Sequence, residues 1–385
     1  MKHYDVIVIG LGIMGAAAGW RSAQAGLTVL GIEAGGPTHS DGSSHGATRI
    51  FRSAYQEGAT YLPLLDLARH GWTELQAASG KRLMSPTGGL FIGPRHTGLV
   101  SGSLRTALAG GIDHEHWNAA ELRRRMPQFA VEDNMHAIFE PGAFAIAAED
   151  ARLQMLNQSV RHGAALRYGC EVTTLENSGD DVVVGTRSGE RFIAGRVIVT
   201  TGPWMARRLL PELAAQIVPH RIPIYWFAPR AGQEPRFDGE RLPVFAYECN
   251  DGALLYGIPA GVSAERGVKI GFHNRQLRPA DACTVAPELD DALRGEMAGY
   301  ATRILPGLDA QPADAKWCFY TMSKDESFVI GDSRALKGVH YASVCSGHGF
   351  KFAPAIGKVL AALAQGQATP VDIRQFSVER FGEQV

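Results

Sequence analysis

The sequence predicts an α/β fold with an added antiparallel β region: a parallel-sheet domain built from separated pieces of the chain, with a β-rich domain inserted into it. Three observations support this prediction. An apolar run at residues 4–10 is followed by small residues, a helical pattern and a second apolar run at 27–34. The segment 338–366 has the same outline. Short alternating runs separated by Gly, Pro and Asn occupy residues 84–144 and 219–320, which indicates antiparallel strands there.

The expected elements follow from the spacing of the apolar residues. In chain order they are a strand at 4–10, a helix ending at Gly26, a strand at 27–34, helices at 60–78 and 149–163, a strand at 165–171, a hairpin at 180–195, a strand at 196–202 and, within 338–366, a strand, a glycine-rich turn and an amphipathic helix. From this order we expect the parallel-sheet domain to contain residues 1–83, 145–218 and 321–385. The inserted domain is expected to contain residues 84–144 and 219–320.

Composition narrows the class of partner. The 385 residues suffice for about two domains, and 45% hydrophobic with 20% charged residues is typical of a globular protein. With 38 basic and 39 acidic residues we expect no nucleic-acid or membrane partner, so a small molecule is the expected ligand. No cleavable signal is evident, and the five cysteines have no CxxC spacing. We therefore expect a cytoplasmic monomer with neither a metal site nor a disulfide scaffold.

A glycine motif marks the first turn. Gly10, Gly12 and Gly15 form GxGxxG between a strand and a helix, the pattern that brings a backbone turn and a helix N-terminus against a pyrophosphate. Glu33 follows at the end of the second strand, where a carboxylate accepts hydrogen bonds from ribose hydroxyls. The alternative is a tight turn with a surface glutamate. The β-rich insertions favour FAD over NAD, so we expect a Rossmann-like FAD-binding domain.

Longer motifs carry a more specific resemblance. The segments DVIVIGLGIMG, GSSHGATRIFRSAY, AIFEP, VKIGFH, WCFYTMSKDESFVIG and CSGHGFKF span nearly the whole chain. In these segments the sequence resembles the monomeric sarcosine oxidase and N-methyltryptophan oxidase family, which are FAD-dependent amine oxidases of the D-amino-acid-oxidase-like superfamily. The glycine motif is shared with many unrelated proteins, whereas SGHGFKF and the Cys-x-Tyr-Thr segment are specific to this group.

The resemblance implies two cationic sites. Arg52 and Lys351 match the residues that bind the substrate carboxylate in the family, and arginine gives bidentate geometry. Arg49 matches a residue on the other face of the flavin, close to Lys269, whose ammonium promotes electron transfer to dioxygen in the family. From spacing alone, the two arginines could instead lie on a solvated turn.

The resemblance also implies roles around the flavin. Cys318 matches the cysteine that is linked covalently to FAD in the family, although spacing alone suggests a buried thiol. Tyr320 and His273 match residues on the substrate side, with sheet packing and a hydrogen-bonded core histidine as the alternatives. Lys269 and His273 are four residues apart, so both would face one side of a strand. The remaining residues expected to contact FAD are His45, Thr48, Gly347 and Gly349.

Two departures from the family concern the substrate. Ala246 stands where sarcosine oxidases have a methionine, and the adjacent tyrosine pair is replaced by Leu255 and Tyr256. The expected reaction is oxidation of an N-methyl amino acid to an imine that hydrolyses to formaldehyde and the amino acid, with dioxygen reduced to hydrogen peroxide. The changes at Ala246 and Leu255, on the expected wall of the substrate pocket, suggest a substrate other than sarcosine. Oxidation of a cyclic imino acid or a primary amino acid, such as pipecolate or glycine, and an FAD-dependent amine dehydrogenase stay open as alternatives.

Overall fold

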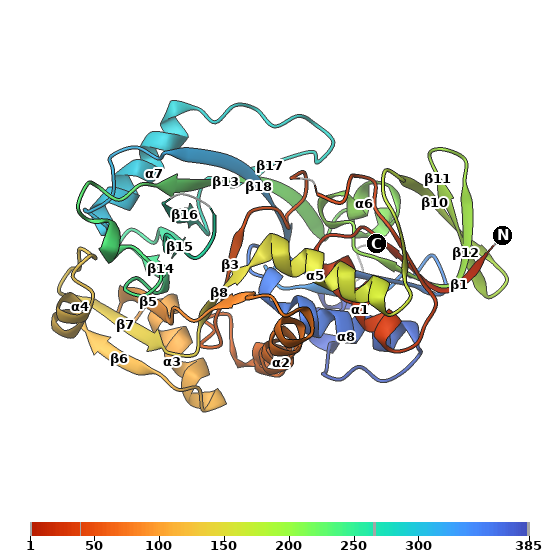
Figure 1. Cartoon of the computed structure of the whole chain (residues 1–385), viewed down its shortest axis with the longest axis horizontal. Helices are drawn as coiled ribbons and strands as arrows, with labels where there is room; N and C mark the ends of the chain where they lie inside the picture. The colour runs from red at the N-terminus through yellow and green to blue at the C-terminus, as the bar shows by residue number, and fades with distance from the viewer. Residues whose placement is uncertain (1, 39, 265–266, 383–385) are drawn as a thin grey trace.

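The computed structural model describes residues 2–38, 40–264 and 267–382. Figure 1 shows two lobes, each organised around one large sheet. The first sheet has eight strands in the order β10-β11-β12-β1-β2-β9, with β20 beside β12 and β19 beside β20. Its strands are β1 (His3–Ile9), β2 (Val29–Ile32), β9 (Ala165–Arg167), β10 (Val172–Ser178), β11 (Asp181–Thr186), β12 (Arg191–Val199), β19 (Val329–Asp332) and β20 (Val339–Ser343).

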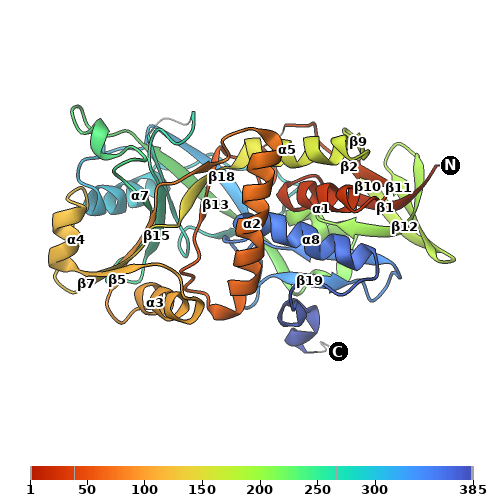
Figure 2. The same ribbon diagram turned by 60° about the horizontal axis from the view of Figure 1, so that its bottom comes forward.

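The centre of this sheet is parallel, as the sequence predicts. β1 pairs in parallel with β2 and β12, and β12 pairs in parallel with β20. Residues Val6–Ile9 of β1 are buried because helices cover the sheet. These helices are α1 (Ile13–Gln24), α2 (Leu62–Ser79), α5 (Ala148–Arg161) and α8 (Ala353–Ala364). Figure 2 shows α1 and α8 lying along the sheet with α2 crossing beside them.

The second lobe contains a nine-stranded sheet. Its order is β17-β13-β16-β15-β14-β5-β7-β6, with β18 on β13, and its one parallel pair is β14 with β5. The strands are β5 (Gly89–Pro94), β6 (Glu115–Asn118), β7 (Met135–Glu140), β13 (Ile217–Phe227), β14 (Val244–Glu248), β15 (Leu254–Ile258), β16 (Val268–Phe272), β17 (Arg278–Pro279) and β18 (Asp314–Ser323). A third, small sheet contains β3 (Thr48–Phe51), β4 (Met84–Ser85) and β8 (Phe144–Ala147).

The antiparallel strands expected at 84–144 and 219–320 are present, but the sequence did not predict the helices that lie among them. This lobe also contains the helices α3 (Gly98–Gly110), α4 (Ala119–Arg125) and α7 (Asp291–Ile304). Glycines in α3 and α7 weaken the helical pattern, yet the Asn118 and Asp290 side chains accept capping bonds from the backbone N–H groups of Glu121 and Leu293. The short helix α6 (Met205–Arg208) was also unforeseen, and the strand expected at 165–171 ends at Arg167.

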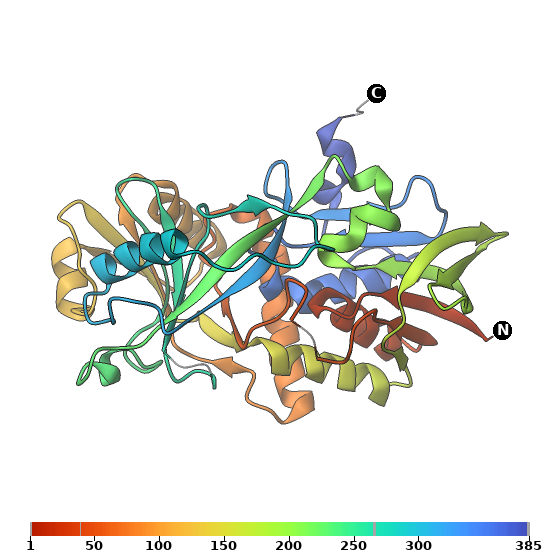
Figure 3. The same cartoon turned by 90° about the horizontal axis from the view of Figure 1, so that it is seen from above.

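Two long strands connect the lobes. β13 and β18 are paired from Ile217–Ser323 to Trp226–Asp314, and Figure 3 shows them running from one lobe into the other. Ile217 packs in the core beneath the first sheet, whereas Tyr225 packs in the core of the second. The domain borders expected near residues 218 and 320 therefore fall inside these strands. In the described part of the chain, no helix is long and apolar enough to cross a membrane.

Candidate active site

A cavity of about 1000 Å³ is lined by residues of both lobes. Every residue singled out by the sequence lines it except Gly15. The lining residues are Gly10, Gly12, Glu33, His45, Thr48, Arg49, Arg52, Lys269, His273, Cys318, Tyr320, Gly347, Gly349 and Lys351. Residues that are far apart in the sequence thus meet around one space. In the described residues, no cluster of three or more His, Cys, Asp or Glu side chains is arranged to hold a metal ion.

The glycine turn has the geometry that the motif requires. Gly10 has φ of +85°, a conformation that favours glycine, and a Cβ atom on Gly15 would lie 1.8 Å from the Gly10 carbonyl oxygen. Gly15 thus permits close packing of α1 on the turn and contributes to the site without lining it. The buried Glu33 carboxylate accepts from the N–H groups of Leu11 (2.8 Å) and Gly35 (3.0 Å). These bonds hold Glu33 beside the turn, where ribose hydroxyls would be bound.

The polar groups of the cavity fit a dinucleotide. At the N-terminus of α1, the Ile13 N–H donates to Ser44 Oγ (3.0 Å). The hydroxyl oxygens of Ser43, Thr201 and Thr321 are buried without a hydrogen-bond partner among the described residues, and all three residues line the cavity. Buried hydroxyls of this kind normally have partners. Phosphate and flavin oxygens would supply them, so the site fits FAD.

Arg49 and Lys269 meet at one backbone carbonyl. The Thr48 carbonyl accepts from Arg49 Nη1 (2.8 Å) and from Lys269 Nζ (3.1 Å). Arg49 Nη2 also donates to the carbonyls of Ser43 (2.9 Å) and His45 (2.7 Å). Lys269 is only 3% exposed, so its ammonium is held inside the protein. Burial lowers the pKa of His45 to about 4, with further lowering by Arg49 and Lys269.

Arg52 faces a carboxylate of the protein itself. Its Nη2 donates to both carboxylate oxygens of Glu57, at 3.0 and 3.1 Å. Burial would raise the pKa of Glu57, but the charges of Arg52 and Lys351 oppose this effect, and the pKa is lowered to about 2. Glu57 is thus ionised at neutral pH. The sequence analysis did not identify Glu57, because only the fold shows which partner an arginine selects.

Lys351 belongs to the short helix η5 (Phe350–Phe352), and it lines the same cavity as Arg52. Its Nζ donates to the His348 carbonyl (2.7 Å) and lies 4.8 Å from the centre of the Tyr55 ring. Burial and then the charge of Arg52 lower the pKa of Lys351 to about 7, although Glu57 opposes the shift. Two cations therefore share one end of the cavity, and one of them is close to losing its proton at neutral pH.

His348 and Tyr55 form a buried pair that the sequence analysis did not assign. Burial lowers the pKa of His348 to about 4, so the ring is neutral. Its Nε2 lies 2.9 Å from the Glu326 carbonyl, which can only accept, so this nitrogen carries the proton. His348 Nδ1 then accepts from the Tyr55 hydroxyl at 2.5 Å. The SGHG motif was the available signal for His348, since its glycines allow the backbone to reach this position.

Glu140 of the AIFEP motif holds the turn that follows Arg52. It is fully buried, and its carboxylate accepts from the N–H groups of Ser53 (3.0 and 2.9 Å) and Ala54 (2.9 Å). Arg69 Nη2 lies 3.4 Å from the same carboxylate. Burial raises the pKa of Glu140, while these bonds and Arg69 oppose the shift. The motif residue thus fixes backbone next to the site without lining the cavity.

Cys318 and Tyr320 lie on β18 and both line the cavity. Burial raises the pKa of the Cys318 thiol, whereas Arg49 and Lys269 favour the thiolate. The rings of Tyr320 and His273 are 6.2 Å apart, and burial lowers the pKa of His273. A Cβ atom on Gly347 would lie 2.5 Å from the Tyr320 ring, so glycine there permits the close approach of the two segments.

The departures from the family lie on adjacent strands. Ala246 of β14 is directly opposite Tyr256 of β15, and both residues line the cavity with Leu255. Ala246 is a smaller side chain than the methionine of the family, and the Tyr256 ring lies against Gly271, where a Cβ atom would be 2.6 Å from the tyrosine hydroxyl. Phe91 and Leu254 make other parts of the lining apolar.

Comparison with known proteins gives three results. Residues 5–363 match a family model described as FAD dependent oxidoreductase. The chain is 36% identical over 380 residues to N-methyl-L-tryptophan oxidase of Yersinia pestis (strain Pestoides F), covering 98% of this chain and 99% of that protein. The same values apply to the enzyme of that name from Yersinia pseudotuberculosis serotype O:1b (strain IP 31758).

Solved structures share the fold. NikD, an unusual amino acid oxidase essential for nikkomycin biosynthesis, has a TM-score of 0.82 and 24% identity, covering 98% of each chain. L-proline dehydrogenase from P. horikoshii has a TM-score of 0.81 and 20% identity, covering 99% of this chain and 98% of that one. Glycine oxidase from Geobacillus kaustophilus has a TM-score of 0.79 and 19% identity, covering 99% of each chain. These similarities confirm the predicted α/β plus antiparallel β fold.

Proposed function

The chain belongs to the FAD dependent oxidoreductase family and is an FAD-dependent amino acid oxidase, and from this premise we propose that its substrate is an N-methyl amino acid. The observation that carries the proposal is the arrangement of four cations around one cavity: Arg52 and Lys351 at one position, and Arg49 and Lys269 at another. When bound, FAD would accept the hydride of amine oxidation, which carries both electrons, and the two electrons would pass with two protons to dioxygen, giving hydrogen peroxide.

Arg52 and Lys351 would bind the carboxylate of the substrate. The guanidinium of Arg52 already holds a carboxylate, that of Glu57, with one nitrogen 3.0 and 3.1 Å from its two oxygens. A substrate carboxylate would take a similar place and add Lys351 as a second cation. His273 and Tyr320, across the cavity, would border the amine and the carbon that is oxidised. This anchoring fixes the orientation of the reacting bond.

Arg49 and Lys269 would act on the other side of the flavin. Their shared bond to the Thr48 carbonyl brings together the buried charge of Lys269 and the half-buried charge of Arg49, and at such a position charges stabilise developing negative charge more strongly than in water. We propose that Lys269 promotes the reduction of dioxygen. The glycine turn, Glu33, His45, Thr48, Gly347 and Gly349 would bind FAD, within a domain of residues 1–83, 145–218 and 321–385, and residues 84–144 and 219–320 would form the substrate domain.

We further propose that Cys318 is linked covalently to the flavin. Two observations support this proposal: the Cys318 thiol lines the cavity, and the charges of Arg49 and Lys269 favour its thiolate, which is the reactive form. After acid precipitation, the yellow colour should stay with the protein pellet and should pass to the supernatant in Cys318→Ser. Cys345→Ser changes another cavity-lining cysteine and should keep its colour in the pellet. A wild-type protein that releases its flavin contradicts the linkage.

The side chain of the substrate is expected to be larger than that of sarcosine. Ala246 opposite Tyr256 widens one wall, and the relative with 36% identity is named for N-methyl-L-tryptophan. The protein is proposed to act as a cytoplasmic monomer. All five cysteines are free, which suits a reducing compartment, and among the described residues the exposed large hydrophobic side chains are the widely separated Leu108, Val160, Val218 and Val285.

The test is a peroxide assay with a panel of N-methyl, cyclic and primary amino acids. We expect hydrogen peroxide together with equimolar formaldehyde from an N-methyl amino acid with a bulky apolar side chain. Peroxide without formaldehyde would assign the substrate to the cyclic or primary amino acids. Reduction of an artificial dye without dioxygen consumption would identify a dehydrogenase and overturn the oxidase assignment.

A further inference from the structure

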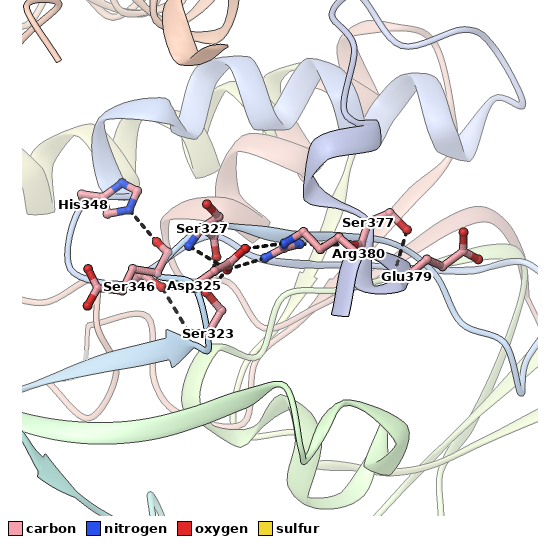
Figure 4. Close-up of polar contacts among 9 residues, drawn as sticks. Ser323, Asp325, Ser327, Ser346, His348, Ser377, Glu379 and Arg380 are labelled. Carbon is pink, nitrogen blue, oxygen red and sulfur yellow. Dashed lines mark hydrogen bonds and ion pairs between the residues drawn. The ribbon is translucent and has the colours of Figure 1, made fainter. Parts of the chain in front are cut away.

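The segment that follows α8 returns to the active site from outside. It contains the short helices η6 (Arg374–Phe376) and η7 (Val378–Phe381). Figure 4 shows Arg380 of η7 directed at Asp325, on the turn between β18 and β19. Arg380 Nε and Nη2 donate to the two carboxylate oxygens of Asp325 at 2.7 and 2.9 Å, and the Arg380 side chain is only 17% exposed. The Asp325 side chain is 43% exposed, so water reaches the carboxylate side of the pair. Its bidentate geometry makes the pair stronger than a surface pair joined by one hydrogen bond.

Asp325 also fixes the turn on which it lies. Its Oδ1 accepts from the Ser327 N–H (3.1 Å) and from Ser323 Oγ (3.2 Å). The next residue, Glu326, has φ of +60°, a left-handed conformation that non-glycine residues rarely adopt. Such a conformation persists only where the surrounding contacts hold it. The Glu326 N–H donates to the Ser323 carbonyl (3.2 Å) and Ser323 Oγ donates to the Ser327 carbonyl (2.5 Å). Asp325 adds its two bonds to this turn, and Arg380 holds Asp325 from outside the turn.

The Glu326 carbonyl is the group that this turn presents to the active site. It accepts from His348 Nε2 at 2.9 Å, which fixes the ring so that His348 Nδ1 accepts from Tyr55 (2.5 Å). The backbone carbonyl of His348 accepts from Lys351 Nζ (2.7 Å), and the same ammonium lies over the Tyr55 ring. The position of the Lys351 charge thus depends on where His348 and Tyr55 are held.

A second contact from the same segment reaches the same histidine. The buried Phe376 packs against Phe328 and Tyr61, with ring centres 5.4 and 5.5 Å apart. Phe328 in turn lies 4.9 Å from the His348 ring, and Tyr61 lies 5.9 Å from it. Phe376 therefore supports His348 from its apolar side, and Arg380 acts through Glu326 on its polar side.

We propose that Arg380 is a positioning residue for the substrate carboxylate: through Asp325 and the Glu326 carbonyl it fixes His348, and thereby Tyr55 and Lys351. The inference rests on the proposed function in one respect, namely that Lys351 and Arg52 bind the carboxylate. It adds a part of the chain that has no contact with the cavity. Loss of the pair releases the turn, the Glu326 carbonyl leaves His348, and the ammonium of Lys351 is no longer held in place.

The experiment compares Arg380→Ala with Arg374→Ala in the FAD-loaded protein. Arg374 lies in the same segment and pairs with Asp372, but its side chain is 91% exposed and makes no contact with the turn, so it is a matched control. Steady-state oxidation gives KM and kcat, and calorimetry with propionate gives the Kd of a simple carboxylate. Amide hydrogen exchange of residues 324–327 and 346–351 reports the turn directly and requires no catalysis.

For Arg380→Ala we expect KM and the propionate Kd to rise by about ten-fold or more, because small displacements of anchoring groups cost factors of this size. The change in kcat should be smaller, exchange in both segments should be faster, and Arg374→Ala should match the wild type. Arg380→Lys keeps the charge without the bidentate geometry and should restore part of the affinity.

The inference is overturned if Arg380→Ala has the same amide hydrogen exchange and the same propionate affinity as the wild type. Equal losses in Arg380→Ala and Arg374→Ala would overturn it as well, since they would show a general loss of stability. If Arg380→Ala does not fold, Arg380→Lys and Asp325→Asn provide the same comparison. A wild type that oxidises no amino acid would refute the proposed function, whereas the exchange measurement would still decide whether Arg380 holds the turn.

Discussion

The four cations of the cavity offset the loss of water through a carboxylate partner, carbonyl partners or a lowered pKa. Arg52 has a carboxylate partner, Lys351 has a lowered pKa, and Arg49 donates to three backbone carbonyls, one of them shared with Lys269. An unpaired buried charge is too costly for a stable protein, so partners of this kind are required. A carbonyl oxygen carries no net charge, so it satisfies the N–H groups of a cation without neutralising that cation. Arg49 and Lys269 are therefore suited to stabilise an anion that forms during the reaction.

Carboxylate binding should weaken as pH rises through neutrality. Lys351 has a pKa of about 7 and is charged below it, whereas Glu57, with a pKa of about 2, stays ionised and His348, with a pKa of about 4, stays neutral from pH 6 to 9. We expect the propionate Kd to rise over this range by up to about ten-fold per pH unit, since the affinity follows the protonated fraction. Lys351→Arg stays charged and should give a flat profile. An equally steep profile in that variant would assign the titration elsewhere.

Of the two lysines near Trp226, only Lys269 should affect the rate at which dioxygen reoxidises the flavin. Lys269 Nζ and Lys316 Nζ lie 5.6 and 5.7 Å from the Trp226 ring, but the Lys316 side chain is 63% exposed. We expect Lys269→Met to slow reoxidation of the reduced enzyme by about 10²- to 10³-fold, because a buried charge at the reacting position is lost. Stopped-flow absorbance measures both half-reactions. Flavin reduction by substrate should change little, and Lys316→Met should behave as the wild type.

At the scale of elements, the close packing of α1 and α8 places the glycine turn. A Cβ atom on Gly357 of α8 would lie 2.5 Å from the Ala17 carbonyl oxygen of α1, so only glycine allows this distance. α1 and α8 pack extensively against each other, and Trp20 of α1 and Val359 of α8 belong to the same hydrophobic core. Since α1 begins at the dinucleotide turn, the spacing of the helices also fixes the FAD site.

Gly357→Ala should lower the free energy of unfolding by about 1–3 kcal/mol through overpacking. Gly295 of α7 provides the comparison, because a Cβ atom there would meet nothing within 4 Å. Gly295→Ala should raise the free energy of unfolding by about 0.5–1 kcal/mol, since alanine is the better helix former. Urea denaturation measures both values. A neutral Gly357→Ala would show that the helices separate without cost.

The elements differ in how far the sequence predicts them. β1, α1 and β2 follow from local signals, namely an unbroken apolar run, small residues and a helical period. α3, α4 and α7 were missed because their helical patterns are weak and only their caps are distinct. In the site, motifs identified the cations, but the partners Glu57, Tyr55 and Glu326 depend on tertiary contacts. No spacing rule predicts that Arg52 pairs with Glu57 or that Arg380 reaches Asp325.

At the scale of the whole molecule, β13 and β18 make the two lobes one structural unit. β13 contributes Ile217 to one core and Tyr225 and Phe227 to the other, and β18 is paired with it over nearly its whole length. A hinge between the lobes would break this ladder. The cavity therefore has walls that are fixed relative to each other.

The two lobes should consequently unfold together. We expect one thermal transition for the FAD-free protein, with coincident midpoints by tryptophan fluorescence and far-UV circular dichroism, because separate melting would require loss of the β13–β18 ladder. Calorimetry should give a calorimetric enthalpy equal to the van't Hoff enthalpy. FAD should raise the midpoint without splitting the transition. Two resolved transitions would show that the lobes are independent.

The order of strands in the first sheet also governs how the protein is made. β1 emerges from the ribosome early, but its partner β12 follows only at residues 191–199, and β20 beside β12 only at residues 339–343. The cavity lining extends from Ile9 to Lys351, so no shorter nascent chain contains it whole. β1 can pair early with β2, but the growing chain carries an open edge of the central sheet, first at β1 and then at β12, until β20 is made. It can capture its cofactor only when translation is nearly finished.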